Sequence, residues 1–257
     1  MADPALTETL LGWSFAFMMV LCRCGAAIML LPGLGEEGPP PTLRVGMALA
    51  LTVLLVPAVG PHLPSMPEDF VHLAGLLAGE LLAGGILGWL ARVVALALPA
   101  AGQIVSLSTG LSSVLQPDQN FGAQSATLGR LFGVGVPVLM FGTGLYALPL
   151  QALAGSYAAL PPGQLPPGAD LMEVVLRAVA AHMSLALRLA APFVLVGAIW
   201  QVALGLLSRL VPQLQIYFAA LPGQVLGGLL LLSLLAGGLV QFWVRAAGEA
   251  FAALPGS

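Results

Sequence analysis

A few ionisable side chains inside long apolar segments are the residues of this sequence with the best chance of doing chemistry. Glu80 is the only acidic residue in its apolar segment, and its nearest possible partners in the sequence, His72 and Arg92, lie eight and twelve residues away. A charge placed in such a segment is by default a candidate for an ion or substrate pathway, and Glu80 and Arg188 both qualify. No paired carboxylates, nucleophile with a base or metal cluster can be assembled around them, so we expect no enzyme.

Cysteine and histidine give no sign of a metal or cofactor site. Cys22 and Cys24 form a C-x-C pair without a second Cys or His cluster, which favours buried small side chains over metal ligands. His62 and His72 flank an acidic loop and His182 stands alone, so neither H-E-x-x-H nor a Ser/His/Asp pattern is present. We therefore expect no metal and no cofactor.

Polar residues form a one-sided pattern between positions 173 and 188. At 100° per residue, Glu173, Arg177, Ser184 and Arg188 fall within about 60° of one another on a helix. Such a stripe should face water or polar protein, because a charge facing lipid is costly. The alternative is that Glu173 and Arg177 simply pair at i,i+4 where the helix leaves the membrane.

The composition decides which solvent surrounds these residues. The chain has 257 residues, of which 59% are hydrophobic and 7% charged, and its mean hydropathy is +0.99. A soluble domain carries roughly a quarter charged residues, so the natural solvent is membrane lipid. All the basic residues are arginine and the net charge is −3, which excludes the clustered positive charge of a nucleic-acid surface.

Proline, glycine and polar breaks divide the chain into about six apolar segments. Each is a candidate helix, since a membrane span needs about 20 mostly apolar residues. Asp3 and Glu8 precede the first segment where a signal peptide carries positive charge, so that segment is expected to be a retained helix. The segments are 10–31, 45–60, 71–105, 126–153, 171–207 and 223–250.

Two of these segments are too long for simple spans. As single helices, 71–105 and 171–207 would be about 50 Å and 55 Å long, against a hydrocarbon core of about 30 Å. Pro99 and Pro192 allow a kink in each. We predict an all-α polytopic membrane protein of about six long kinked helices that ends in a helical hairpin and is packed in a hetero-oligomer.

Small residues at four-residue spacing predict close helix packing. The G-x-x-x-G pattern lets helix backbones approach each other where no hydrophobic force separates helix from lipid. The pairs are Gly75/Gly79, Gly84/Gly88, Gly129/Gly133 and Gly223/Gly227.

The arginines predict an orientation in the membrane. Arg44, Arg130 and Arg209 lie in or beside the first, third and fifth breaks. The breaks at 61–70 and 156–170 contain no arginine or lysine, and their charged residues are acidic. Because short cytoplasmic loops collect arginine and lysine, this alternation places both termini outside the cytoplasm.

Several motifs together resemble the FliR family of flagellar export-gate proteins, relatives of the SctT/YscT subunits of type III secretion systems. They are Pro41 with Arg44 before an apolar helix, Gly79-Glu80, "GLS" at 110–112 before a proline-containing loop, and "PQLQI" at 212–216 followed by Pro222. The resemblance extends over nearly the whole chain. It departs from the family where Gln103 stands in place of a frequent acid and Gln215 in place of a frequent asparagine.

The resemblance implies a protein-export gate made by a single membrane domain, 1–257. Residues 1–170 would be a part like the P subunit, and 171–250 a hairpin like the Q subunit. The partners implied are FliP-like and FliQ-like gate subunits, a FlhB-like switch subunit, a FlhA-like export component, membrane lipid and unfolded proteins in transit, with no nucleic acid. The place implied is the bacterial inner membrane at the flagellar basal body, with both termini periplasmic.

The resemblance also implies two sites. A loop near 111–124 would help to plug the channel, through Leu111, Val114, Leu115, Pro117 and Phe121. The hairpin tip would contact neighbouring subunits at the cytoplasmic mouth, through Arg209, Pro212, Gln213, Gln215, Pro222 and Gln224. Side-chain amides both donate and accept hydrogen bonds, which suits hairpins bonded side to side, and Pro212 and Pro222 are expected to bound the tip.

Two other functions stay open. The same subunit could belong to a virulence-type injectisome, which this sequence barely separates from a flagellar system. A small-solute secondary transporter would use Glu80 or Arg188 as its coupling site, but the paired broken helices typical of that class are not found in matching halves of the sequence.

Overall fold

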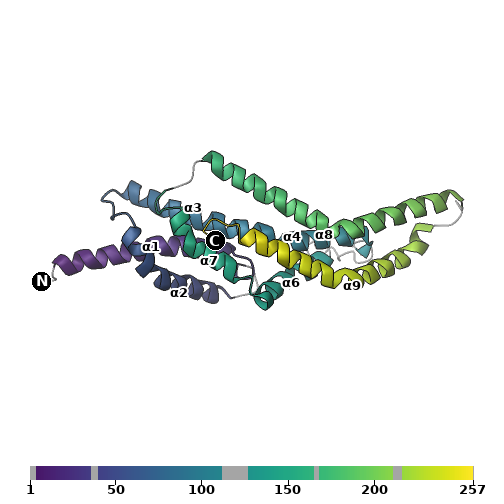
Figure 1. Cartoon of the computed structure of the whole chain (residues 1–257), viewed down its shortest axis with the longest axis horizontal. Helices are drawn as coiled ribbons and strands as arrows, with labels where there is room; N and C mark the ends of the chain where they lie inside the picture. Colours follow the sequence, from purple (N-terminus) through teal and green to yellow (C-terminus); the bar gives the residue numbers. More distant parts are fainter. Residues whose placement is uncertain (1–3, 36–39, 112–126, 165–167, 211–215, 257) are drawn as a thin grey trace, which may run out of the picture. The chain divides into compact units, whose positions relative to one another are not determined.

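The computed structural model of the chain describes residues 4–35, 40–111, 127–164, 168–210 and 216–256, and within these ranges it is helical, with no strand (Figure 1). This confirms the predicted all-α class. The helices are α1 (Pro4–Leu30), α2 (Pro41–Val59), the short 3-10 helix η1 (Gly60–His62), α3 (Phe70–Ala95), α4 (Ala97–Ser108), α6 (Thr127–Thr143), α7 (Ala147–Ala159), α8 (Gly168–Leu210) and α9 (Ile216–Phe251).

Most of these helices could cross a membrane. Among the described residues, five helical spans are long and apolar enough, and a sixth results if α6 and α7 are counted as one bent span. The spans have mean hydropathies between 1.7 and 2.1. The prediction of about six apolar helices is therefore confirmed, and the chain is a membrane-embedded protein.

Two predicted segments are each divided into two helices. The segment 71–105 breaks at Leu96, between α3 and α4, and Pro99 lies in the first turn of α4. Proline is tolerated there because the first amides of a helix have no intrahelical acceptor. The segment 126–153 bends by 76° between α6 and α7, where Gly144 has a φ of +76° that other residues rarely adopt.

The last two helices are longer than the sequence suggested. α8 has 43 residues and passes through Pro192, and Figure 1 shows it changing direction along its length. α9 has 36 residues and already begins at Ile216, so Pro222 lies inside it. The expectation that Pro222 bounds the hairpin tip is wrong: the proline costs one intrahelical bond near the helix start, and the long apolar run after it propagates the helix.

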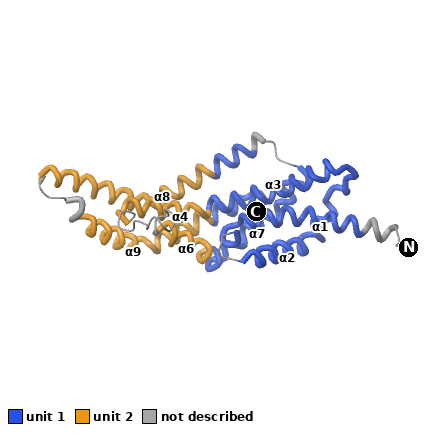
Figure 2. The backbone as a smooth tube through the Cα atoms, turned by 180° about the vertical axis from the view of Figure 1, so that it is seen from behind, with its two compact units in different colours: residues 1–94, 140–178, 248–257 blue, residues 95–139, 179–247 orange. Residues whose placement is uncertain are grey.

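The chain forms two compact units (Figure 2). Unit 1 comprises residues 1–94, 140–178 and 248–257, and unit 2 comprises 95–139 and 179–247. Each unit takes segments from both sides of residue 170. The division into a P-like part and a Q-like hairpin at that residue stays a prediction.

In unit 1, α1 packs closely against α3. A Cβ atom at Gly84 would collide with the backbone of Arg23, and one at Gly88 would lie 2.6 Å from the carbonyl oxygen of Ala27. Gly84 and Gly88 therefore allow the backbones of α1 and α3 to approach closely, as their spacing predicted. A buried cluster beside it joins α1, α2 and α7 through Val20, Cys24, Ala27, Val56, Val59 and Leu153.

In unit 2, α4 packs against α6, α8 and α9. Buried Val105, Leu128, Ala190 and Phe193 form the centre of this cluster, and side chains of α9 pack against it. A Cβ atom at Gly129 would lie 2.6 Å from Cγ of Gln103, so this predicted glycine also allows a close approach. Among the described residues, no atom lies within 4 Å of a Cβ placed at Gly75 or Gly227, so these two predicted glycines do not serve packing within the described part of the chain.

Candidate functional site

The most polar buried site of unit 1 is an ion pair between Arg23 of α1 and Glu80 of α3. Nε of Arg23 donates to Oε2 of Glu80 at 2.8 Å, and Nη2 donates to Oε1 at 3.0 Å. This two-pronged geometry matches the planar guanidinium to the carboxylate. Arg23 is 1% exposed and Glu80 is 0% exposed, so the pair is fully enclosed.

The same two side chains hold the turn that follows α7. Nη1 of Arg23 donates to the carbonyl oxygen of Leu160 at 3.0 Å and to Oγ of Ser156 at 3.3 Å. The backbone amide of Gly163 donates to Oε1 of Glu80 at 3.1 Å. The pair therefore fixes both ends of the short connection between α7 and the residues that lead into α8.

An aromatic ring covers the guanidinium. The Cζ atom of Arg23 lies 4.2 Å from the ring centre of Tyr157, where a cation is attracted by the face of the ring. The Tyr157 hydroxyl lies 3.9 Å from Sγ of Cys24. Cys24 is fully buried, which confirms the prediction that it is a buried small side chain. All three residues belong to unit 1.

This arrangement ties α1 and α3 to the turn after α7 through paired charges and hydrogen bonds. Each carboxylate oxygen of Glu80 accepts at least one hydrogen bond, and each guanidinium nitrogen of Arg23 donates at least one. Burying two charges is tolerable only with such pairing. The sequence singled out Glu80 correctly as an intramembrane charge but did not find its partner, which lies 57 residues away.

The predicted polar stripe on α8 is exposed. Glu173 and Arg177 form the expected i,i+4 ion pair, with side chains 62% and 77% exposed. Ser184 and Arg188 are exposed as well. The local ion pair is thus confirmed.

A second polar contact lies at the C-terminal end of α4, in unit 2. Nε2 of Gln224, on α9, donates to the carbonyl oxygen of Ser108 at 3.2 Å. Leu111, the last described residue after α4, packs against the buried cluster of unit 2. One residue predicted for the hairpin tip and one predicted for the plug therefore both lie near the C-terminal end of α4.

The remaining predicted site residues are either exposed or lie outside the described ranges. Arg209 lies exposed near the end of α8, and Pro222 is exposed inside α9. The following residues lie outside the described part of the chain: Val114, Leu115, Pro117, Phe121, Pro212, Gln213 and Gln215.

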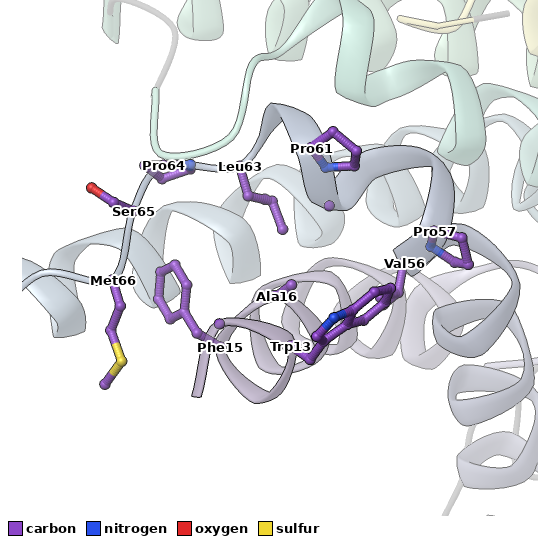
Figure 3. Close-up of a pocket in the computed structure, with 12 residues that line it drawn as sticks. Trp13, Phe15, Ala16, Val56, Pro57, Pro61, Leu63, Pro64, Ser65 and Met66 are labelled. Atoms are coloured by element: carbon purple, nitrogen blue, oxygen red, sulfur yellow. The ribbon is translucent and has the colours of Figure 1, made fainter. Parts of the chain in front are cut away.

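A hollow found among the described residues of unit 1 is apolar (Figure 3). It has a volume of about 560 Å³ and lies between the N-terminal half of α1 and the connection from α2 through η1. Trp13, Phe15 and Met66 are among its lining residues, and none of the residues that line it is an acid, a base or a cysteine. Elsewhere in the described ranges, no group of three or more His, Cys, Asp or Glu residues could hold a metal ion.

The sequence of this chain matches a family of known proteins. A family profile described as "Bacterial export proteins, family 1" matches residues 14–250. The flagellar biosynthetic protein FliR of Caulobacter vibrioides is 30% identical over 225 residues, which cover 88% of this chain and 90% of the relative. FliR of Bacillus subtilis is 27% identical, with 80% of each chain covered.

A translocation protein is also similar. The Yop proteins translocation protein T of Yersinia pestis is 28% identical over 224 residues, covering 85% of this chain and 81% of the relative. With a profile match over nearly all residues and a relative at 30% identity over most of both chains, this chain belongs to the FliR family of bacterial export proteins.

Proposed function

We propose that this chain is a structural and gating subunit of the flagellar type III protein-export channel, which carries unfolded flagellar proteins across the inner membrane. The observation that carries the proposal is the match to the export family over residues 14–250, together with similarity to FliR proteins over most of both chains. The helical, apolar fold is what a membrane-embedded subunit needs.

The proposal includes partners and a place. The subunit works with FliP-like and FliQ-like gate proteins, a FlhB-like switch subunit and a FlhA-like export component, in the inner membrane at the flagellar basal body and with both termini in the periplasm. Large exposed side chains along α8 and α9, such as Leu195, Leu206 and Leu234, support such an assembly, because lipid or other protein must cover them.

Glu80 does not support a solute transporter. A coupling carboxylate must exchange its proton or ion with the pathway, whereas Glu80 is fully buried and bonded to Arg23 and to the amide of Gly163. Arg188 lines a hollow of about 210 Å³ between α8 and α9, but its other lining residues are apolar or glycine.

Deleting the gene and restoring it tests the proposal. We expect the deletion strain to be non-motile and to retain flagellar filament protein inside the cell, and the wild-type gene to restore secretion. Normal secretion without the gene would overturn the proposal. Loss of solute uptake into vesicles with intact secretion would favour the transporter instead.

An injectisome subunit is the second candidate, because the Yersinia translocation protein T is similar over 85% of this chain. The two systems export different proteins. If the neighbouring genes encode needle-complex parts and the deletion leaves motility intact while it abolishes secretion of effector proteins, the injectisome assignment replaces the flagellar one.

A plug near residues 111–124 is part of the proposal. The segment follows α4 directly, and its first residue, Leu111, packs on the core of unit 2. We expect deletion of several residues between 112 and 124 to make cells leaky to small ions or dyes. Unchanged permeability in cells that still assemble the complex would contradict this role.

A further inference from the structure

The C-terminal end of α4 is held by the α8–α9 hairpin through a hydrogen bond that the helix itself cannot make. The last carbonyl groups of a helix have no intrahelical donor. The carbonyl oxygen of Ser108 is one of these, and the side-chain amide of Gln224 donates to it at 3.2 Å. Gly110 follows with a φ of +75°, and a Cβ atom there would lie 3.2 Å from Cδ of Gln224. The end of α4 thus rests directly on this side chain.

Two glycines bring both arms of the hairpin against the same helix end. A Cβ atom at Gly197 of α8 would lie 2.8 Å from the carbonyl oxygen of Ser108. A Cβ atom at Gly228 of α9 would lie 2.5 Å from Cβ of Thr109. Such distances leave no room for any side chain larger than hydrogen, so the seat of α4 depends on glycine in both arms. We call these three residues, Gly197, Gln224 and Gly228, the α4 seat.

The contact is incompletely packed. A hollow of about 260 Å³ opens beside Ser108 and Thr109 between the two arms of the hairpin. It is lined by Trp200 among others, whose indole Nε1 is buried without a hydrogen-bond partner among the described residues. Removing the Gln224 hydrogen bond would therefore leave the helix end with free space beside it.

We propose that Gln224 is a positioning residue: with Gly197 and Gly228 it fixes the end of α4, so the hairpin sets the point from which the chain continues into residues 111–124. The consequence for channel permeability rests on the proposed function, whereas the position of the helix end does not.

Thiol reactivity at Leu111 tests the position directly. Leu111→Cys is introduced into the full chain in native membranes, with Cys22 and Cys24 replaced by alanine, and labelled with a membrane-permeant maleimide. Because Leu111 packs against the core of unit 2, we expect slow labelling. Gln224→Met removes the donor at similar length and should speed labelling about fivefold, as the loss of one hydrogen bond implies for a local opening.

Matched variants control for general effects. Gly228→Ala should speed labelling like Gln224→Met, whereas Gly227→Ala should not, since no atom lies within 4 Å of a Cβ placed there. Gln241→Met, at an exposed position of α9, controls for the loss of an amide. Equal labelling rates in Gln224→Met and Gln241→Met would overturn the proposal even if Gly228→Ala failed to assemble.

The same variants separate this inference from the proposed function. If the α4 seat also governs the channel, Gln224→Met raises dye leakage in cells that assemble the complex, and Gln241→Met does not. If Gln224→Met speeds labelling but secretion does not depend on the gene, the positioning role holds and the export function is rejected. If Gln224→Met leaves labelling unchanged but secretion does depend on the gene, the export function holds and the positioning role is rejected.

Discussion

At the scale of residues, the ion pair of Arg23 and Glu80 determines whether unit 1 can exist in an apolar environment. Either charge alone, enclosed among α1, α3 and α7, would have no water to solvate it. Together the two side chains satisfy each other and both ends of the turn after α7. The pair and its turn therefore form one unit of structure, in which the loss of either partner affects three helices.

Breaking the pair from one side should be far worse than removing it. We expect Arg23→Met or Glu80→Met to destabilise the complex by about 3–5 kcal/mol, because the remaining charge stays buried without a counter-charge. The double variant, Arg23→Met with Glu80→Met, should recover much of that loss. The measurement is the unfolding temperature of the purified complex in detergent.

Arg177→Ala is the control for this series. Its ion pair with Glu173 is exposed on both sides, and such pairs contribute about 0–1 kcal/mol. If the single variants at Arg23 and Glu80 unfold at the same temperature as Arg177→Ala, the ion pair does not have the role assigned to it.

The ring of Tyr157 makes a separate contribution. Tyr157→Phe keeps the ring face over the guanidinium of Arg23, so secretion and stability should change little. Tyr157→Leu removes the face and should cost about 2 kcal/mol, the scale of a desolvated cation–π contact. The same unfolding assay compares the two, and equal losses would assign the effect to the hydroxyl group instead.

The sequence allowed half of this site to be predicted. Glu80 stands out because it is a lone acid in an apolar run, but the partners nearest to it in the sequence, His72 and Arg92, do not indicate its pairing with Arg23. Arg23, between Cys22 and Cys24, is likewise a lone charge in an apolar run. Two isolated opposite charges in different membrane segments are candidates to pair, and only the fold shows that they do.

At the scale of elements, glycine sets the distance between α1 and α3. A Cβ atom at Gly84 would overlap the backbone of Arg23, whereas one at Gly85 would only touch the tip of Leu30, at 4.0 Å. The two neighbouring glycines therefore offer a matched comparison on one helix.

We expect Gly84→Ala to destabilise unit 1 and Gly85→Ala to be neutral or stabilising. Both changes gain about 1 kcal/mol of helix propensity, but only the first forces the two backbones apart, which typically costs about 1–3 kcal/mol. Protease resistance of the complex in membranes measures the difference. Identical behaviour of both variants would contradict the close approach.

Helix boundaries show what the pattern of apolar residues can and cannot predict. The apolar runs located the helices, since membrane spans are selected by length and hydropathy. They did not locate the break at Leu96 or the bend at Gly144, and they placed the start of α9 too late, after Pro222 instead of at Ile216. Proline restricts a helix only locally, and whether it ends there depends on packing that the sequence does not display. The residues between 112 and 126 and between 211 and 215 lie outside the described ranges.

At the scale of the whole molecule, the amount of exposed apolar surface is the dominant feature. Of the most apolar stretch of α9, 0% of the residues are buried within the chain, and for α8 and α2 the share is 22%. Lipid can cover one side of such helices, but α8 and α9 are about 65 Å and 54 Å long, well beyond a hydrocarbon core of about 30 Å. We infer that other protein covers the apolar part that extends past the lipid.

We propose that this chain acts as one subunit of a larger export channel. The most direct test is to isolate the epitope-tagged chain from membranes of its own cells in mild detergent and to identify the proteins in the complex by mass spectrometry. We predict one assembly that contains FliP-like and FliQ-like subunits in fixed proportion, and an aggregation-prone chain when it is expressed alone. A stable, monodisperse monomer, isolated without these partners from cells that export normally, would contradict the account.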